Sequence, residues 1–77
     1  MKLTQKQAAK FVRLAYQEVD KHPSLRFGQA LWNLLTEEHK DLTDRYNGTS
    51  LDFYYQAKDA DVMDCFFNEY VEYSDED

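Results

Sequence analysis

Hydrophobic residues recur along residues 5–21 at the three- and four-residue spacing of one helical face. Ala8 and Phe11 belong to this face, and lysines, arginine and glutamine occupy the opposite side. Thr4 and Gln7 have the form of a capping box, in which each side chain bonds the other residue's backbone N–H. The pattern predicts an amphipathic helix from about residue 5 to residue 21.

The most apolar stretch of the chain follows its only proline. Pro23 fixes its own φ and has no backbone N–H, which suits the start of a helix. Apolar residues then follow a broad helical arc, which predicts a second helix from about Ser24 to Leu35 or Thr36. Gly28 lies inside this arc and costs roughly 1 kcal/mol against alanine. We interpret it as a point where another element approaches closely.

Three polar residues of this helix, Arg26, Gln29 and Asn33, recur at i, i+3 and i+7 and form a stripe. One interpretation is a recognition stripe for a partner or ligand. The interpretation we favour is that these side chains hold a neighbouring loop, because loop backbone groups need hydrogen-bond partners. Arg26 would then pair with a carboxylate such as Asp52, and the two amides would bond loop carbonyls.

Residues 36–46 are mostly charged, with Leu42 and Tyr46 as apolar anchors, and predict a continued or a short separate helix. Asn47 and Gly48 follow as a strong turn signal, because both residue types tolerate a positive φ.

The aromatic segment 49–55 comes next. We expect a loop or a single helical turn that places Phe53 and Tyr54 in the core beside Trp32, since so small a domain needs those rings inside. The alternative is a pocket of stacked aromatic rings for a base or another planar ligand.

A third helix is predicted to begin at Asp59, which would serve as the N-cap. Its core side is wide and apolar. The residues of that side are Val62, Met63, Phe66, Phe67, Tyr70 and Val71. The predicted fold class is therefore all-α, a compact single domain of three or four helices over residues 1–73, followed by a disordered acidic tail at residues 74–77.

The chain has 77 residues, the size of one small domain. Its single cysteine excludes a disulfide within the chain, and a reducing cytoplasm fits that count better than secretion. Residues 1–10 lack the apolar core of a signal peptide, and no apolar run reaches the roughly 18 residues of a membrane span. We therefore expect a cytoplasmic protein without a membrane segment.

The net charge of −6 is unevenly distributed, because residues 1–35 are net basic and residues 36–77 are strongly acidic. This balance disfavours direct binding of nucleic acid and favours a protein partner with a basic surface. We expect the partner to contact an acidic surface formed by the third helix, its end and the segment 37–44. The candidate residues are Asp59, Asp61, Asp64, Glu69 and Glu72.

The chemistry of catalysis and cofactor binding is not apparent in the chain. His22, His39 and Cys65 stand far apart in no metal-ligand spacing. Phosphate loops, nucleophile elbows and dinucleotide fingerprints are lacking. We expect a non-enzyme that holds no metal and no cofactor.

The run HPSLRFGQALWNLL at residues 22–35, followed by DFYYQAKDADVMDCF at residues 52–66, resembles a widespread group of small uncharacterised bacterial and phage proteins. That group shares an Arg-apolar-Gly-Gln-x-x-x-Asn segment and a downstream Asp-x-Phe-Tyr type segment. The matching residues are Arg26, Gly28, Gln29, Asn33, Asp52 or its neighbour, Phe53 and Tyr54. The second tyrosine and the insert at residues 56–58 depart from the pattern. The resemblance implies a small helical protein from a phage or mobile element and supplies no catalytic residues.

These observations favour a small acidic interaction module, encoded by a phage, that binds and inhibits or redirects a host protein in the host cytoplasm. If the partner is a nucleic-acid-binding enzyme, the carboxylates would stand in for phosphates. One alternative is a structural or assembly protein whose apolar surplus closes a homodimer. Another is a nucleic-acid or small-ligand binder that uses the Arg26, Gln29 and Asn33 stripe.

Overall fold

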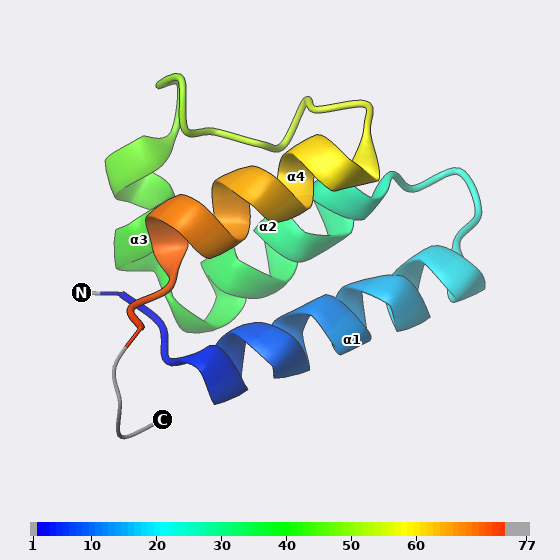
Figure 1. Ribbon diagram of the computed structural model, residues 1–77. Coiled ribbons are helices and arrows are strands. Elements are labelled where there is room, and N and C mark those ends of the chain that lie inside the picture. Colours follow the sequence, from blue (N-terminus) through cyan, green and yellow to red (C-terminus); the bar gives the residue numbers. More distant parts are fainter. Residues whose placement is uncertain (1, 74–77) are drawn as a thin grey trace.

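The computed structural model describes residues 2–73 and confirms the all-α prediction. Its elements are α1 (Gln5–Lys21), α2 (Phe27–Glu38), α3 (Lys40–Tyr46), α4 (Asp59–Cys65) and the π-helix η1 (Phe66–Tyr70). Helix α2 contacts α1, α3 and α4, and η1 extends α4 (Figure 1). In residues 2–73 no helix has the length and apolar character needed to cross a membrane. The tail predicted at residues 74–77 lies outside the described residues.

Helix α1 begins and ends where the sequence predicts. The Thr4 N–H donates to Gln7 Oε1 at 2.9 Å, and the Gln7 N–H donates to Thr4 Oγ1 at 3.2 Å, which completes the capping box. Ala8, Phe11 and Ala15 are buried against the rest of the protein. The periodicity therefore identified both the length of this helix and the face that packs.

Helix α2 begins three residues later than predicted. Ser24 and its neighbours form a turn in which the Leu25 N–H donates to His22 O at 2.8 Å. Arg26 is the N-cap, with an extended backbone, and its N–H donates to Gln29 Oε1 at 3.2 Å. The helix begins at this later position because the Gln29 side chain accepts a hydrogen bond from the N–H of Arg26, the residue that precedes the helix.

The far end of α2 also differs, because the helix continues to Glu38 instead of ending at Leu35 or Thr36. The His39 N–H makes the last helical bond, to Leu35 O, and the His39 backbone then leaves the helical conformation with φ −136° and ψ 57°. Helix α3 follows as the short separate helix that was one of the two predictions.

Gly28 marks a close approach, as predicted. A Cβ at this position would lie 2.6 Å from Phe53 O and 3.2 Å from Val62 Cγ2. Real Cβ atoms almost never come within 3.0 Å of a backbone oxygen. The missing side chain therefore lets both the segment around Phe53 and helix α4 lie directly on α2.

An aromatic cluster fills the centre of the core. Phe53 is only 1% exposed, and its ring centroid lies 5.2 Å from those of Trp32 and Tyr70 and 6.0 Å from that of Phe66. These rings meet at steep angles, the edge-to-face geometry that aromatic pairs prefer. The prediction that Phe53 enters the core beside Trp32 is confirmed, whereas Tyr54 is half-buried at the edge.

The start of α4 corrects another prediction. Lys58, not Asp59, is the N-cap. The Lys58 backbone is extended, and its carbonyl accepts from the N–H groups of Asp61 and Val62, each at 3.1 Å. Asp59 is thus the first helical residue. Its negative charge interacts favourably with the positive end of the helix dipole, but its side chain does not cap the helix.

The π-helix η1 was not predicted. Val62, Phe66 and Tyr70 are spaced by four residues and are all buried. Successive four-residue steps drift around a regular α-helix, which has 3.6 residues per turn. The wider turn of a π-helix takes more residues per revolution, so Phe66 and Tyr70 stay on the face that contacts Phe53.

The segment at residues 47–58 connects α3 to α4 and is tied to the core at Leu51. The Leu51 carbonyl accepts from Tyr70 Oη at 2.8 Å and from Cys65 Sγ at 3.3 Å. Gly48 has φ +76°, which agrees with the predicted turn. Burial raises the pKa of the Tyr70 hydroxyl far above its usual value, and the negative charge of Asp52 adds to the effect.

The Tyr70→Phe variant is expected to lose about 1 kcal/mol of unfolding free energy at pH 7, because one buried hydrogen bond is removed. The folded Tyr70 pKa lies above the unfolded value of about 10, so its contribution is complete below pH 10 and is lost as the pH rises further. Urea unfolding at pH 7 and above pH 10 measures both effects. A difference between variant and wild type that stays constant through the alkaline range would contradict this interpretation.

The two ends of the described chain pair with each other, which the sequence did not indicate. The Leu3 N–H donates to Tyr70 O at 2.9 Å, and the Glu72 N–H donates to Leu3 O at 2.8 Å. The result is an isolated parallel bridge between Leu3 and Val71, both of which are buried. It fixes the end of η1 beside the start of α1 (Figure 1).

Candidate functional site

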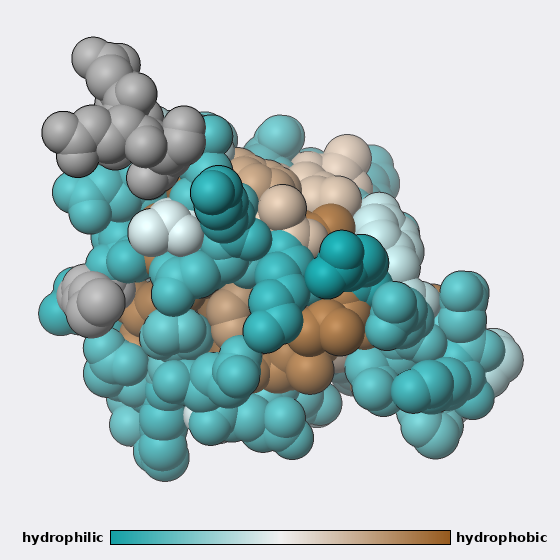
Figure 2. Space-filling view, turned by 90° about the horizontal axis from the view of Figure 1, so that it is seen from below, coloured by the Kyte–Doolittle hydropathy of each residue, from teal (hydrophilic) through white to brown (hydrophobic). Residues whose placement is uncertain are grey.

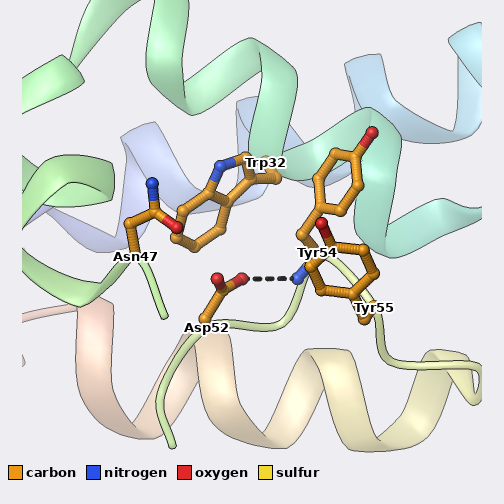
Figure 3. Close-up of a pocket in the computed structure, with 5 residues that line it drawn as sticks. All are labelled: Trp32, Asn47, Asp52, Tyr54 and Tyr55. Carbon is orange, nitrogen blue, oxygen red and sulfur yellow. Dashed lines mark hydrogen bonds between the residues drawn. The ribbon is translucent and has the colours of Figure 1, made fainter. Parts of the chain in front are cut away.

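A small cavity of about 180 Å³ opens between α2, the end of α3 and the segment 47–58. We call it the aromatic pocket. Its lining residues are Trp32, Asn47, Asp52, Tyr54 and Tyr55. In Figure 3, the indole, the amide and the carboxylate surround a space whose other side is closed by the two tyrosine rings.

The aromatic walls of the pocket differ in exposure. Trp32 is 8% exposed, so only a small part of its indole reaches the surface, and Phe53 packs against it from the core. Tyr54 is half-buried and meets Tyr55 edge-to-face, with ring centroids 4.9 Å apart. Tyr55 is 79% exposed, so this ring contributes far less to the core than the other two.

Asp52 is half-buried and organises the floor of the pocket. Its Oδ2 accepts from the Gly48 N–H at 2.9 Å, and its Oδ1 accepts from the Tyr54 N–H at 3.0 Å. In residues 2–73 the single ion pair is Lys40 with Asp44, so no lysine or arginine of the described chain neutralises Asp52. The carboxylate charge therefore remains available to a ligand.

Cys65 is half-buried at the end of α4 and contacts the segment 47–58 at Leu51. Burial raises the pKa of its thiol, and the charges of Glu69 and Asp52 raise it further. The thiol is therefore held protonated and donates to Leu51 O. This environment is the opposite of the one that activates a cysteine nucleophile.

The structure corrects the predicted loop contacts of Arg26 and Gln29. Arg26 is exposed and does not pair with Asp52, whose oxygens bond backbone N–H groups instead. The Gln29 side chain bonds the backbone of Arg26 and not a loop carbonyl. Asn33 is exposed, and no hydrogen bond of its side chain appears among the described residues. The use of this stripe for binding stays a prediction.

The acidic candidates lie on α4 and just beyond it. Asp59, Asp61 and Asp64 are exposed, as is Glu72 after η1, whereas Glu69 is half-buried. None of them forms an ion pair with a lysine or arginine of residues 2–73. The structure thus presents most of these carboxylates to solvent without a countercharge.

The basic residues of α1 occupy a different face. Lys6, Lys10 and Arg13 are exposed along its outer side. Figure 2 shows this side from below, where hydrophilic groups cover most of the surface and apolar side chains emerge between them. Helix α1 is thus net positive, whereas α4 carries three aspartates and no basic residue.

The histidines and the cysteine do not form a metal site. Within residues 2–73, no group of three or more His, Cys, Asp or Glu side chains has the arrangement needed to hold a metal ion. His39 packs instead against Phe11, with ring centroids 5.7 Å apart.

The sequence offered an aromatic pocket at segment 49–55 beside Trp32 only as the alternative to core packing, and it did not place Asn47 or Asp52 in that pocket. The local signal for a pocket was the second tyrosine, Tyr55. Packing in the core explains the ring of Phe53, but it does not explain a further ring at Tyr55. Comparison of the chain with models of protein families, with curated proteins and with solved structures finds no match. The geometry offers two candidate surfaces for function, the acidic surface of α4 and the aromatic pocket, and the stripe of Arg26, Gln29 and Asn33 stays a prediction.

Proposed function

We propose that this protein is a small interaction module that binds a basic surface of a partner protein through the carboxylates of α4 and its extension. The observation that carries the proposal is the exposure of Asp59, Asp61 and Asp64 without any ion pair to a described lysine or arginine. An unneutralised acidic surface attracts a basic partner over a distance of about one Debye length, roughly 8 Å at physiological salt.

The charge distribution supports the same function. Because α1 is net basic and α4 carries only acidic charges, the protein has an oriented field as well as a net charge of −6. Such a field speeds association with a complementary surface and orients the encounter. A nucleic-acid ligand is disfavoured, because its phosphates would be repelled by the larger, acidic part of this field.

The biological setting of the proposal comes from the sequence resemblance. A phage-encoded module acting in the host cytoplasm would inhibit or redirect a host protein. If that protein binds nucleic acid, the carboxylates of α4 would occupy the positions of phosphates on its basic surface. Catalysis by the module itself has no part in this proposal.

Affinity capture from host lysate tests the function directly. The variant carries Asp59→Lys, Asp61→Lys and Asp64→Lys, three exposed changes that leave the core untouched. We expect the wild type to retain one host protein and the variant to bind that protein at least about tenfold more weakly, because like charges then face each other. The isolated pair, measured by titration, should also bind less tightly as salt increases.

The matched control reverses three exposed charges on the other helix, with Lys6→Glu, Lys10→Glu and Arg13→Glu. This variant is expected to retain the partner. Equal binding by the wild type and the α4 variant would contradict the proposal. A wild type that captures no partner, and whose stability rises with its own concentration, would point to self-assembly instead.

A further inference from the structure

The aromatic pocket combines three aromatic side chains with a carboxylate that forms no ion pair with a lysine or arginine of residues 2–73. Aromatic faces attract cations through the ring quadrupole, and tryptophan and tyrosine do so most strongly. We propose that the pocket binds the guanidinium group of an arginine side chain. The inference rests on the proposed function for its source, a basic partner that presents the arginine.

The size of the pocket favours a single side chain. Its volume of about 180 Å³ is smaller than the pockets of about 300–1,000 Å³ that hold drug-sized ligands and cofactors. The planar head of an arginine fits such a space, and the rest of the ligand would lie outside against the exposed ring of Tyr55.

The hydrogen bonds of Asp52 leave room for this ligand. An ionised carboxylate has about four acceptor positions. The Gly48 and Tyr54 N–H groups use one on each oxygen, so one remains free on each. A guanidinium donates two parallel N–H bonds to a carboxylate, which matches that remaining pair. The side-chain carbonyl of Asn47, which also lines the pocket, can accept a further hydrogen bond from the guanidinium.

Arginine fits these walls better than the other candidates. Its guanidinium is flat and weakly hydrated, so it stacks on rings, whereas the ammonium of lysine is a compact, strongly hydrated charge. A phosphate-bearing ligand would face the Asp52 carboxylate and a net charge of −6. A neutral base could stack on the rings and donate N–H groups to Asp52, but it would bring no positive charge to the carboxylate.

The single tryptophan gives the pocket its own reporter. Trp32 is the only tryptophan of the chain, so a ¹H–¹⁵N correlation spectrum holds one indole N–H signal. The probes are acetyl-arginine methylamide and acetyl-citrulline methylamide, which have the same shape but differ in charge. We expect the arginine compound to shift the signal saturably in the millimolar range and the citrulline compound to have no saturable effect.

Two variants test the walls and the floor. Tyr55→Ala removes an exposed ring and is expected to weaken binding about two- to fivefold. Asp52→Asn removes the charge and is expected to weaken it about tenfold. The matched control is Tyr73→Ala, which removes another exposed tyrosine and should leave binding unchanged. Because Asp52 also bonds the segment 47–58, the Tyr55 variant keeps the test valid if Asp52→Asn disturbs the fold.

Three results would overturn the inference. Equal shifts from both compounds would mean that charge is not recognised. A saturable shift from adenosine but not from the arginine compound would make the pocket a nucleobase site. A signal that no compound saturates would leave the pocket without a cationic ligand.

The α4 variant separates this inference from the proposed function. Its three lysines are exposed on another element, so arginine binding should change by less than about twofold at physiological salt, where distant charges are screened. Loss of partner capture with intact arginine binding supports both proposals. Partner capture that survives in the α4 variant contradicts the acidic surface alone, and failed arginine binding contradicts the pocket alone.

Discussion

The Phe53→Ala variant is expected to be largely unfolded at 25 °C. Phe53 is 1% exposed and contacts the rings of Trp32, Phe66 and Tyr70, so alanine would leave a cavity at the centre of the aromatic cluster. Phenylalanine-to-alanine changes in cores cost about 3–5 kcal/mol. A domain below about 80 residues has only about 3–5 kcal/mol of net stability. The two quantities are equal within their spread, which removes the margin that keeps the chain folded.

Far-ultraviolet circular dichroism with urea unfolding measures this loss. The matched control is Phe67→Ala, the same substitution at a half-buried phenylalanine. We expect the control to stay folded, because a half-buried ring leaves a smaller cavity and less lost burial. If the two variants lose equal stability, Phe53 is not the centre of the core.

The second large effect is expected for Gly28→Ala, a change that normally stabilises a helix. Propensity alone predicts a gain of about 1 kcal/mol. Against this, the new Cβ would lie 2.6 Å from Phe53 O, and a backbone oxygen cannot move without its peptide. Overpacking costs about 1–3 kcal/mol and more where the neighbour is fixed. We expect a net loss of about 2 kcal/mol in unfolding free energy.

Gly48 is the matched control, because it is needed for its positive φ and not for a close approach. Gly48 has φ +76° and nothing within 4 Å of an added Cβ, so Gly48→Ala costs only conformational strain, about 1–2 kcal/mol. The Gly28 variant should in addition shift the backbone resonances of residues 52–54, which the Gly48 variant does not crowd. A Gly28→Ala protein more stable than the wild type would mean that α2 and the segment around Phe53 do not approach so closely.

Local signals in the sequence predicted much of the fold. The periodicity of residues 5–21 gave the bounds of α1, and the capping box marked its start, because both depend on neighbours within one turn. The interior glycine predicted the close approach at Gly28. Phe53 was assigned to the core because a domain this small needs its large aromatic rings inside.

Long-range contacts account for what could not be predicted. The π-helix η1 keeps Phe66 in contact with Phe53, and Phe53 comes from a segment without regular structure. The sequence around residues 66–70 therefore does not by itself predict the π-helix. The late start of α2 depends on which side chain bonds the Arg26 N–H, and propensity does not decide that choice. The pocket forms where Trp32 of α2 meets the segment 47–58, so no single stretch of sequence carries its pattern.

The pairing of Leu3 with Val71 has a consequence for how the protein is made. The bridge joins residues that are among the first and the last of the described chain to be synthesised. On the ribosome, α1 and α2 can form early, but Leu3 has no partner until Val71 has emerged from the exit tunnel. The apolar surface at the start of α1 therefore stays open until Val71 has emerged, and its closure depends on a contact between residues that are far apart in the sequence.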